Sequence, residues 1–169
     1  MNKFNKESFF REIAGSHKGI FYKVARTYCA GSPGEQEDLI QEILLQVWKS
    51  IDKYNDSYAL STWLYRISIN TAISYYRKHS RISQANVRVE SESGYGGTPP
   101  DNSEQERISL LMKFISELGE VDKAIMLLYL EEKTHAEMSA ILGFSVSNIG
   151  TRIGRIKEKL KIRFLESEK

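Results

Sequence analysis

The feature that most constrains this chain is a long polar interruption in an otherwise helical sequence. Between residues 82 and 107 the apolar periodicity is lost, and Ser, Gly, Glu, Asn and Pro predominate. On both sides of it apolar residues recur every three or four positions, as in amphipathic helices, and no run alternates as a strand would. A segment of this composition is typical of a flexible linker. The sequence therefore predicts an all-α protein with two small helical domains, residues 1–81 and 108–169, joined by a linker over 82–107.

Short breaker sequences divide the first domain. Gly31-Ser-Pro-Gly34 and Asn55-Asp-Ser57 separate helices predicted over residues 6–30 (interrupted near 15–18), 35–51 and 60–78. Domains of this size have small cores, so either one is expected to gain stability from a partner surface.

Several classes of protein are excluded by the residues that are missing. No apolar run approaches the roughly 18 residues of a membrane span, and the N-terminus lacks a signal-peptide pattern, so we expect a cytoplasmic protein without membrane insertion. Cys29 is the single cysteine, and the three histidines are far apart, which argues against disulfides and metal sites. No catalytic constellation or phosphate-binding glycine loop is present. We therefore predict a non-enzymatic protein without a cofactor.

The helix predicted over residues 60–78 carries an aromatic residue on a polar, basic face. Helical spacing places five residues on this side: Trp63, Arg66, Asn70, Ser74 and Arg77. A stacking ring beside an amide and two guanidinium groups suits an unstacked nucleic-acid base and its phosphates. The alternative is that Trp63 is partly buried against a neighbour.

The helix predicted over residues 35–51 has one leucine outside its apolar stripe. Leu45 lies among polar residues that include Asp38, Gln41 and Glu42. A leucine in such a setting is typical of an anchor in a protein contact. Single exposed leucines are also common without any function.

Residues 134–163 have the layout of a helix-turn-helix. Thr134 caps a short helix, Gly143 makes the turn, and Ser145 or Ser147 caps the second helix. The core stripe of that second helix is predicted to contain Val146, Ile149, Ile153, Ile156 and Leu160. The opposite face carries the candidate reading residues Asn148, Thr151, Arg152, Arg155 and Lys159.

The charge distribution supports this interpretation. The whole chain has a formal net charge of only +2, but residues 146–163 contain six basic residues against one acid, 6 − 1 = +5. A basic amphipathic helix can also be a membrane-surface or calmodulin-target-like helix. The capped helix and turn that precede it argue against both alternatives.

Two blocks of sequence resemble one protein family. The first comprises Asp38-Leu-Ile-Gln-Glu-Ile-Leu-Leu-Gln-Val-Trp48, Lys53-Tyr54 and Ser61-Thr-Trp-Leu-Tyr-Arg-Ile-Ser-Ile-Asn-Thr-Ala72. It resembles conserved region 2 of bacterial RNA polymerase sigma factors of the extracytoplasmic-function (ECF) group. The second block, residues 118–160, resembles region 4 of the same sigma-70 family. The resemblance implies a transcription initiation subunit with a region 2-like bundle and a region 4-like helix-turn-helix.

The resemblance also implies roles for the candidate residues. In this family the helix that corresponds to residues 35–51 docks on the β′ coiled coil of core RNA polymerase. The matching positions in this chain are Asp38, Gln41, Glu42 and Leu45. At the −10 promoter element Trp63 would support strand opening, and Asn70, with the loop over residues 55–61, would bond a flipped-out base. Phosphates there would be neutralised by Arg66, Arg77 and Lys78, with Ser74 completing the face.

At the −35 element the second helix of the helix-turn-helix would enter the major groove. Arg152 and Arg155 are then the best candidates for base or phosphate contacts. Gly150 and Gly154 depart from the family, in which larger side chains are frequent there. Either fewer side-chain contacts or a closer approach of the backbone to DNA would follow.

The implied partners are core RNA polymerase (β′ and β subunits), promoter DNA and an anti-sigma factor, and no homo-oligomer is required. One alternative is a stand-alone regulator that binds duplex operator DNA through residues 134–163, which would have no use for Trp63 and Asn70. Another is a helical adaptor that binds no DNA, which would tolerate the loss of Arg152 and Arg155.

Overall fold

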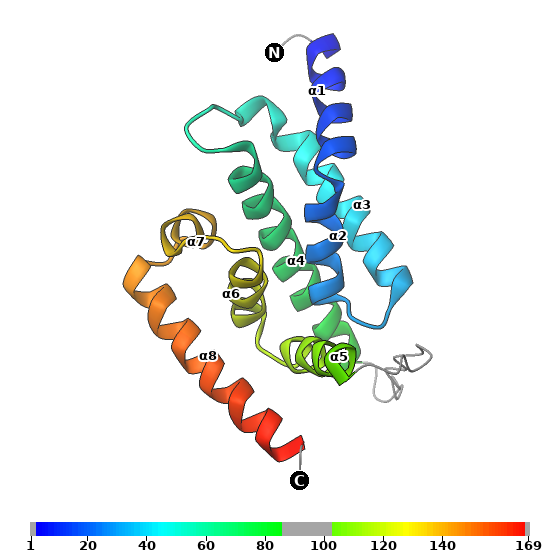
Figure 1. Ribbon diagram of the computed structural model, residues 1–169. Coiled ribbons are helices and arrows are strands. Elements are labelled where there is room, and N and C mark those ends of the chain that lie inside the picture. Colours follow the sequence, from blue (N-terminus) through cyan, green and yellow to red (C-terminus); the bar gives the residue numbers. More distant parts are fainter. Residues whose placement is uncertain (1–2, 86–102, 168–169) are drawn as a thin grey trace. The chain divides into compact units, whose positions relative to one another are not determined.

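The computed structural model describes residues 3–85 and 103–167 (Figure 1). Every regular element in these two ranges is helical, which confirms the prediction of an all-α fold. The chain divides into two compact units, Met1–Ser93 and Gly94–Lys169, which we call unit 1 and unit 2. Among the described helices, none is both long and apolar enough to cross a membrane.

Unit 1 is a bundle whose centre consists of three helices. Its elements are α1 (Lys3–Ser16), α2 (Lys18–Tyr28), α3 (Pro33–Ser50), the 3-10 turn η1 (Ile51–Lys53) and α4 (Leu60–Ala85). Helices α2, α3 and α4 lie side by side (Figure 1), each packed on the other two. Apolar residues at helical spacing form this core, and the largest fully buried ones are Ile13, Phe21, Leu39, Ile43, Ile51, Leu64 and Ile69. The packing leaves the opposite faces of α3 and α4 toward solvent.

Unit 2 contains α5 (Ser103–Ser116), α6 (Glu120–Leu130), α7 (His135–Leu142) and α8 (Val146–Ser167). The long helix α8 packs against the other three. Ile149, Ile153, Ile156 and Leu160 are buried as predicted. Val146 was wrongly predicted to join this stripe: it is 49% exposed, because it is the first residue of α8 and precedes the packed turns.

The predicted linker is wrong at both ends. Helix α4 continues past the predicted end at residue 78, and residues 79–85 contain neither Gly nor Pro to stop it. Helix α5 begins at Ser103 rather than near residue 108, with Glu104 and Glu106 placed favourably in its first turn. Residues 86–102, the remainder of the predicted linker, lie outside the described residues.

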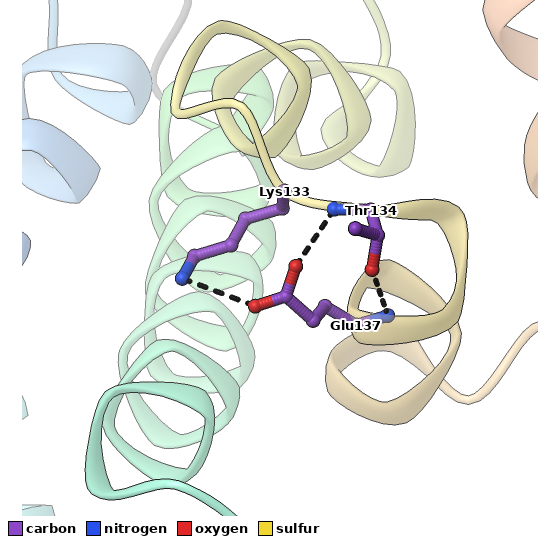
Figure 2. Close-up of polar contacts among 3 residues, drawn as sticks. All are labelled: Lys133, Thr134 and Glu137. Carbon is purple, nitrogen blue, oxygen red and sulfur yellow. Dashed lines mark hydrogen bonds and ion pairs between the residues drawn. The ribbon is translucent and has the colours of Figure 1, made fainter.

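A capping box fixes the start of α7, as Figure 2 shows. The Glu137 backbone N–H donates to Thr134 Oγ1 at 3.1 Å, and the Thr134 N–H donates to the Glu137 carboxylate at 2.8 Å. Lys133 Nζ lies 3.5 Å from the same carboxylate. The Thr134 bonds, followed by the Lys133 charge, hold the pKa of Glu137 below its ordinary value.

The turn after α7 takes the predicted form. Gly143 has φ of 77°, a left-handed conformation that glycine adopts without strain. The N–H of Asn148 then donates to Ser145 Oγ at 3.1 Å, so Ser145, rather than Ser147, caps α8. In the helix-turn-helix, specific hydrogen bonds therefore cap the first turn of both α7 and α8.

Candidate nucleic-acid interface

Trp63 lies at the start of α4 but is less isolated than the sequence predicted. Its side chain is half-buried, and its ring centroid lies 5.1 Å from that of Tyr54, with 49° between the planes. Tyr54 in turn lies 6.0 Å from Phe9 of α1, between ring centroids. The structure thus agrees with the alternative of partial burial against a neighbour, because the turn before α4 brings an aromatic residue against Trp63. The ring retains partial exposure to solvent.

The remainder of the predicted α4 face is exposed. Arg66, Asn70, Ser74, Arg77 and Lys78 all lie on the solvent side of the helix. Three of them line a groove of about 600 Å³ between α4 and α3, together with α3 residues: Asn70, Ser74, Lys78, Glu42, Gln46 and Ser50. Within it Gln46 donates to the Glu42 carboxylate at 2.8 Å. The structure therefore brings one predicted polymerase contact, Glu42, next to the predicted −10 face.

The predicted protein-contact patch on α3 is largely exposed. Asp38 and Gln41 are exposed, Glu42 is half-buried, and Leu45 is 44% exposed at the centre of the patch. The four residues share one helical face, because they are three or four positions apart. Leu45 lies apart from the buried stripe of Leu39, Ile43 and Val47.

On α8 four of the five predicted reading residues are exposed: Asn148, Thr151, Arg155 and Lys159. With Arg152 and Asp122 they line a groove of about 540 Å³ in unit 2. Thr151 Oγ1 donates to the Ser147 carbonyl at 3.0 Å, so this hydroxyl is engaged with its own helix. Arg155 and Lys159 are the exposed cations of this face.

Arg152 differs from the prediction. Its side chain is half-buried, and Nη1 donates to Asp122 Oδ1 of α6 at 3.0 Å. Its Nε donates to Asn148 Oδ1 at 3.1 Å, and its guanidinium carbon lies 5.1 Å from the centroid of the Phe144 ring. Arg152 is therefore engaged within unit 2 and is not a fully outward side chain as predicted, because α6 supplies an acid next to it. We call Asp122, Asn148, Arg152 and Phe144 the arginine clamp.

Two structural partners, Tyr54 and Asp122, were missed by sequence reasoning. Tyr54 belongs to the region 2-like block, and nothing in its spacing indicates contact with Trp63. Asp122 lies 30 residues before Arg152 on another helix, and in sequence it is one of two acids in the first turn of α6.

The two unusual glycines of α8 are not required by packing. A methyl group at Gly150 would lie 3.7 Å from the His135 ring, an ordinary contact distance, and one at Gly154 would meet nothing within 4 Å.

Within the described residues no group of three His, Cys, Asp or Glu side chains is placed to hold a metal ion.

Comparison with known proteins gives a consistent result. Residues 13–82 match the family Sigma-70 region 2, and residues 108–160 match Sigma-70, region 4. The ECF RNA polymerase sigma factor SigW of Bacillus subtilis (strain 168) is 27% identical over 163 residues, which cover 90% of this chain and 87% of SigW. The ECF RNA polymerase sigma-E factor of Escherichia coli (strain K12) is 29% identical over 139 residues, covering 75% and 72%.

A solved structure has a similar fold. It contains the sigma factor RpoE in complex with the anti-sigma factor NepR from Bartonella quintana, with a TM-score of 0.71 and 21% identity, and the match covers 96% of this chain and 99% of that one. At this identity the likeness concerns the fold alone. The two family matches together span both units, which does not favour a stand-alone operator-binding regulator. The chain belongs to the ECF group of the sigma-70 family, the sigma factors that direct promoter-specific transcription initiation.

Proposed function

We propose that this sigma factor divides promoter recognition between its two units. The observation that carries the proposal is the presence of two different faces on one chain: a half-exposed Trp63 near an exposed Asn70 on α4, and an exposed cationic face on α8. Aromatic and amide groups serve unstacked bases, whereas a helix behind a helix-turn-helix corner reads an intact duplex. Unit 1 therefore acts where the strands separate, and unit 2 acts on closed DNA.

At the −10 element Trp63 stacks at the edge of the melted region. Asn70, with the turn over residues 55–61, hydrogen-bonds a base that has left the stack. Arg66, Arg77 and Lys78 neutralise the phosphates, and Ser74 completes the face. The exposure of these polar residues on one side of α4 supports this assignment.

At the −35 element α8 enters the major groove. Asn148, Thr151, Arg155 and Lys159 are exposed along its outer face and supply the contacts. The capped turn before α8 supports the assignment, since it sets the direction in which the helix leaves the corner.

Core RNA polymerase binds through α3. Leu45 is an apolar anchor within a polar rim, with Asp38, Gln41 and Glu42 around it, a composition typical of a protein contact that carries its energy in one residue. We assign this patch to the β′ coiled coil. The partner is the core enzyme, which also contains the β subunit. The chain itself has no catalytic role, because the polymerase performs the chemistry.

We further propose that an anti-sigma factor regulates this chain. The similar structure of RpoE is of a complex with its anti-sigma factor NepR, which supports this class of partner. Such a partner would occupy surfaces that the polymerase otherwise uses.

The test is run-off transcription with purified bacterial core polymerase, with and without the chain, on promoters from its own genome. We expect transcripts that appear only when the chain is present, with shared motifs upstream of their starts. Core polymerase that is neither bound nor redirected by the chain would contradict the proposal.

A further inference from the structure

The arginine clamp lies within the cationic face of α8, yet it uses Arg152 internally. The Asp122 carboxylate and Asn148 amide oxygen take two of the five N–H donors that a guanidinium group carries, and the Phe144 ring lies close to the group. These contacts come from α6, from α8 and from the turn between α7 and α8. Arg152 therefore joins three elements of unit 2, as a structural side chain does.

Asp122 places a negative charge on the face that otherwise attracts DNA. It lines the same groove as Arg155 and Lys159, and its side chain is only 22% exposed. The bond to Arg152 is a charge-assisted hydrogen bond of 3.0 Å, a strong class of contact. The pair adds no net charge to the groove.

The charge available for DNA is therefore smaller than the sequence indicates. Residues 146–163 carry +5, and pairing with Asp122 reduces this to 5 − 1 = +4. Arg163 is also paired, with Glu117 of α5, and Lys157 lies 4.4 Å from the centroid of the Tyr129 ring. Of the cations that line the groove, Arg155 and Lys159 have no acidic partner among the described residues.

Transfer of Arg152 from Asp122 to a DNA phosphate would gain little. It would exchange one charge-assisted bond for another, and would leave a partly buried carboxylate unpaired beside the phosphate. The clamp is therefore expected to persist when α8 is on DNA.

We propose that Asp122 is a positioning residue that withholds Arg152 from the DNA phosphates and so limits non-specific binding by α8. Arg152 then orients the start of α8, and Arg155 and Lys159 provide the phosphate charge. This inference rests on the proposed −35 role of α8 and adds a determinant of its specificity.

The test is the salt dependence of binding between the full-length chain and a fluorescein-labelled, mixed-sequence DNA duplex, measured by fluorescence anisotropy. Asp122→Asn keeps the shape of the side chain and removes its charge. We expect several-fold tighter binding, and a slope of log K against log salt that is steeper by about 1, since one released arginine neutralises about one more phosphate. If Asp122 only stabilised the fold, Asp122→Asn would partly unfold unit 2 and would weaken DNA binding. That result is the opposite of the tighter binding expected here.

Two further variants separate release of Arg152 from a general change of charge. Glu158→Gln removes one negative charge from an exposed position of α8 outside the clamp, so its slope should remain close to that of the wild type. The double variant Asp122→Asn with Arg152→Ala should also return to the wild-type slope. An Asp122→Asn slope equal to that of Glu158→Gln, or a flattened slope in the double variant, would overturn the proposal.

Arg155→Ala distinguishes this proposal from the function on which it depends. If α8 reads DNA, this variant flattens the slope by about 1, whatever Asp122 does. A wild-type chain that fails to bind the duplex even at low salt would refute the DNA role of α8, and the withholding of Arg152 with it. A flattened Arg155→Ala slope with an unchanged Asp122→Asn slope would refute the withholding alone.

Discussion

Trp63 in unit 1 and Arg152 in unit 2 occupy comparable positions near the start of a helix, but they are held by different forces. Trp63 is held by a ring, Tyr54, which is itself backed by Phe9. Arg152 is held by a carboxylate and an amide, Asp122 and Asn148. The first set of contacts is apolar, and the second is mainly polar, with the Phe144 ring beside the guanidinium group.

The difference determines what each side chain can still do. The tilted contact with Tyr54 leaves part of the Trp63 ring exposed, so the ring can stack on a base and keep its support. The polar contacts of Arg152 engage two of the five N–H donors by which its guanidinium group could recognise DNA. Contacts of the first kind are insensitive to salt, whereas those of the second kind weaken as salt rises or acids are protonated.

The largest effect is expected when the aromatic support of unit 1 is removed. Tyr54→Ala leaves Trp63 without its neighbouring ring, and we expect a loss of about 2 kcal/mol in unfolding free energy and about tenfold less promoter opening. Urea unfolding and a fluorescent base analogue in the −10 element measure the two losses.

Tyr54→Phe is the matched control for this change. It keeps the ring 5.1 Å from Trp63 and removes only the hydroxyl, whose bond to the Tyr58 carbonyl is long, at 3.4 Å. Opening should stay near the wild-type level. An opening rate for Tyr54→Ala as fast as that of the control would show that Trp63 needs no support.

Within α4 the amide and the guanidinium groups are expected to act differently. Asn70→Ala should change the preferred base at one −10 position by about tenfold, because an amide reads a base edge. Arg77→Ala should weaken all promoters similarly and flatten the salt slope of the holoenzyme by about 1. Equal losses for both variants on every promoter sequence would refute this division.

The polar contacts of unit 2 should respond to loss of a single cap. Thr134→Ala removes one half of the capping box, and we expect thermal unfolding to report a loss of about 1 kcal/mol. Thr134→Ser preserves the hydroxyl and should lose much less. A Thr134→Ala chain as stable as the serine variant would mean that tertiary packing alone holds α7.

The smallest expected effect is a pH dependence at Glu137. Its folded pKa is lowered below 4.5, mainly by the Thr134 hydrogen bonds, so the folded state favours the ionised form. The stability gained is present above the unfolded pKa and is lost as pH falls through the folded pKa. The effect is modest, because this side chain is 40% exposed.

Thermal unfolding of the wild type and Glu137→Gln, at neutral pH and below pH 4.5, measures this contribution. We expect the difference between the two proteins to shrink toward acid. A difference that is independent of pH would show that the charge of Glu137 does not contribute. Tyr54→Ala, by contrast, should destabilise unit 1 by the same amount at both pH values.

Helical periodicity predicted the fold well, because each helix buries a stripe that repeats every three or four residues. It separated Leu45 from the apolar stripe of its helix, in which Leu39, Ile43 and Val47 are buried. The helix-turn-helix was predicted equally well, because Thr134 and Gly143 are residue types that cap the two ends of a helix. The C-terminal end of α4 and the start of α5 were predicted wrongly. Polar residues without Gly or Pro are compatible with either a helix or a linker.

The partners of the functional side chains could not be predicted in the same way. Periodicity relates residues on one helix, whereas Asp122 and Arg152 lie on different helices, 30 residues apart. The turn that brings Tyr54 to Trp63 is likewise a matter of tertiary packing. Which residues face outward was therefore accessible from sequence, but which of them are already engaged was not.

The most direct test of the division between the units is a comparison of Trp63→Ala and Arg155→Ala on two templates. One template is a fully paired promoter, and the other is the same promoter with the −10 region unpaired in advance by mismatches. Run-off transcription by each reconstituted holoenzyme is the readout. We predict that the unpaired template restores transcription to Trp63→Ala and leaves Arg155→Ala impaired. Restoration of both variants, or of neither, would contradict the account.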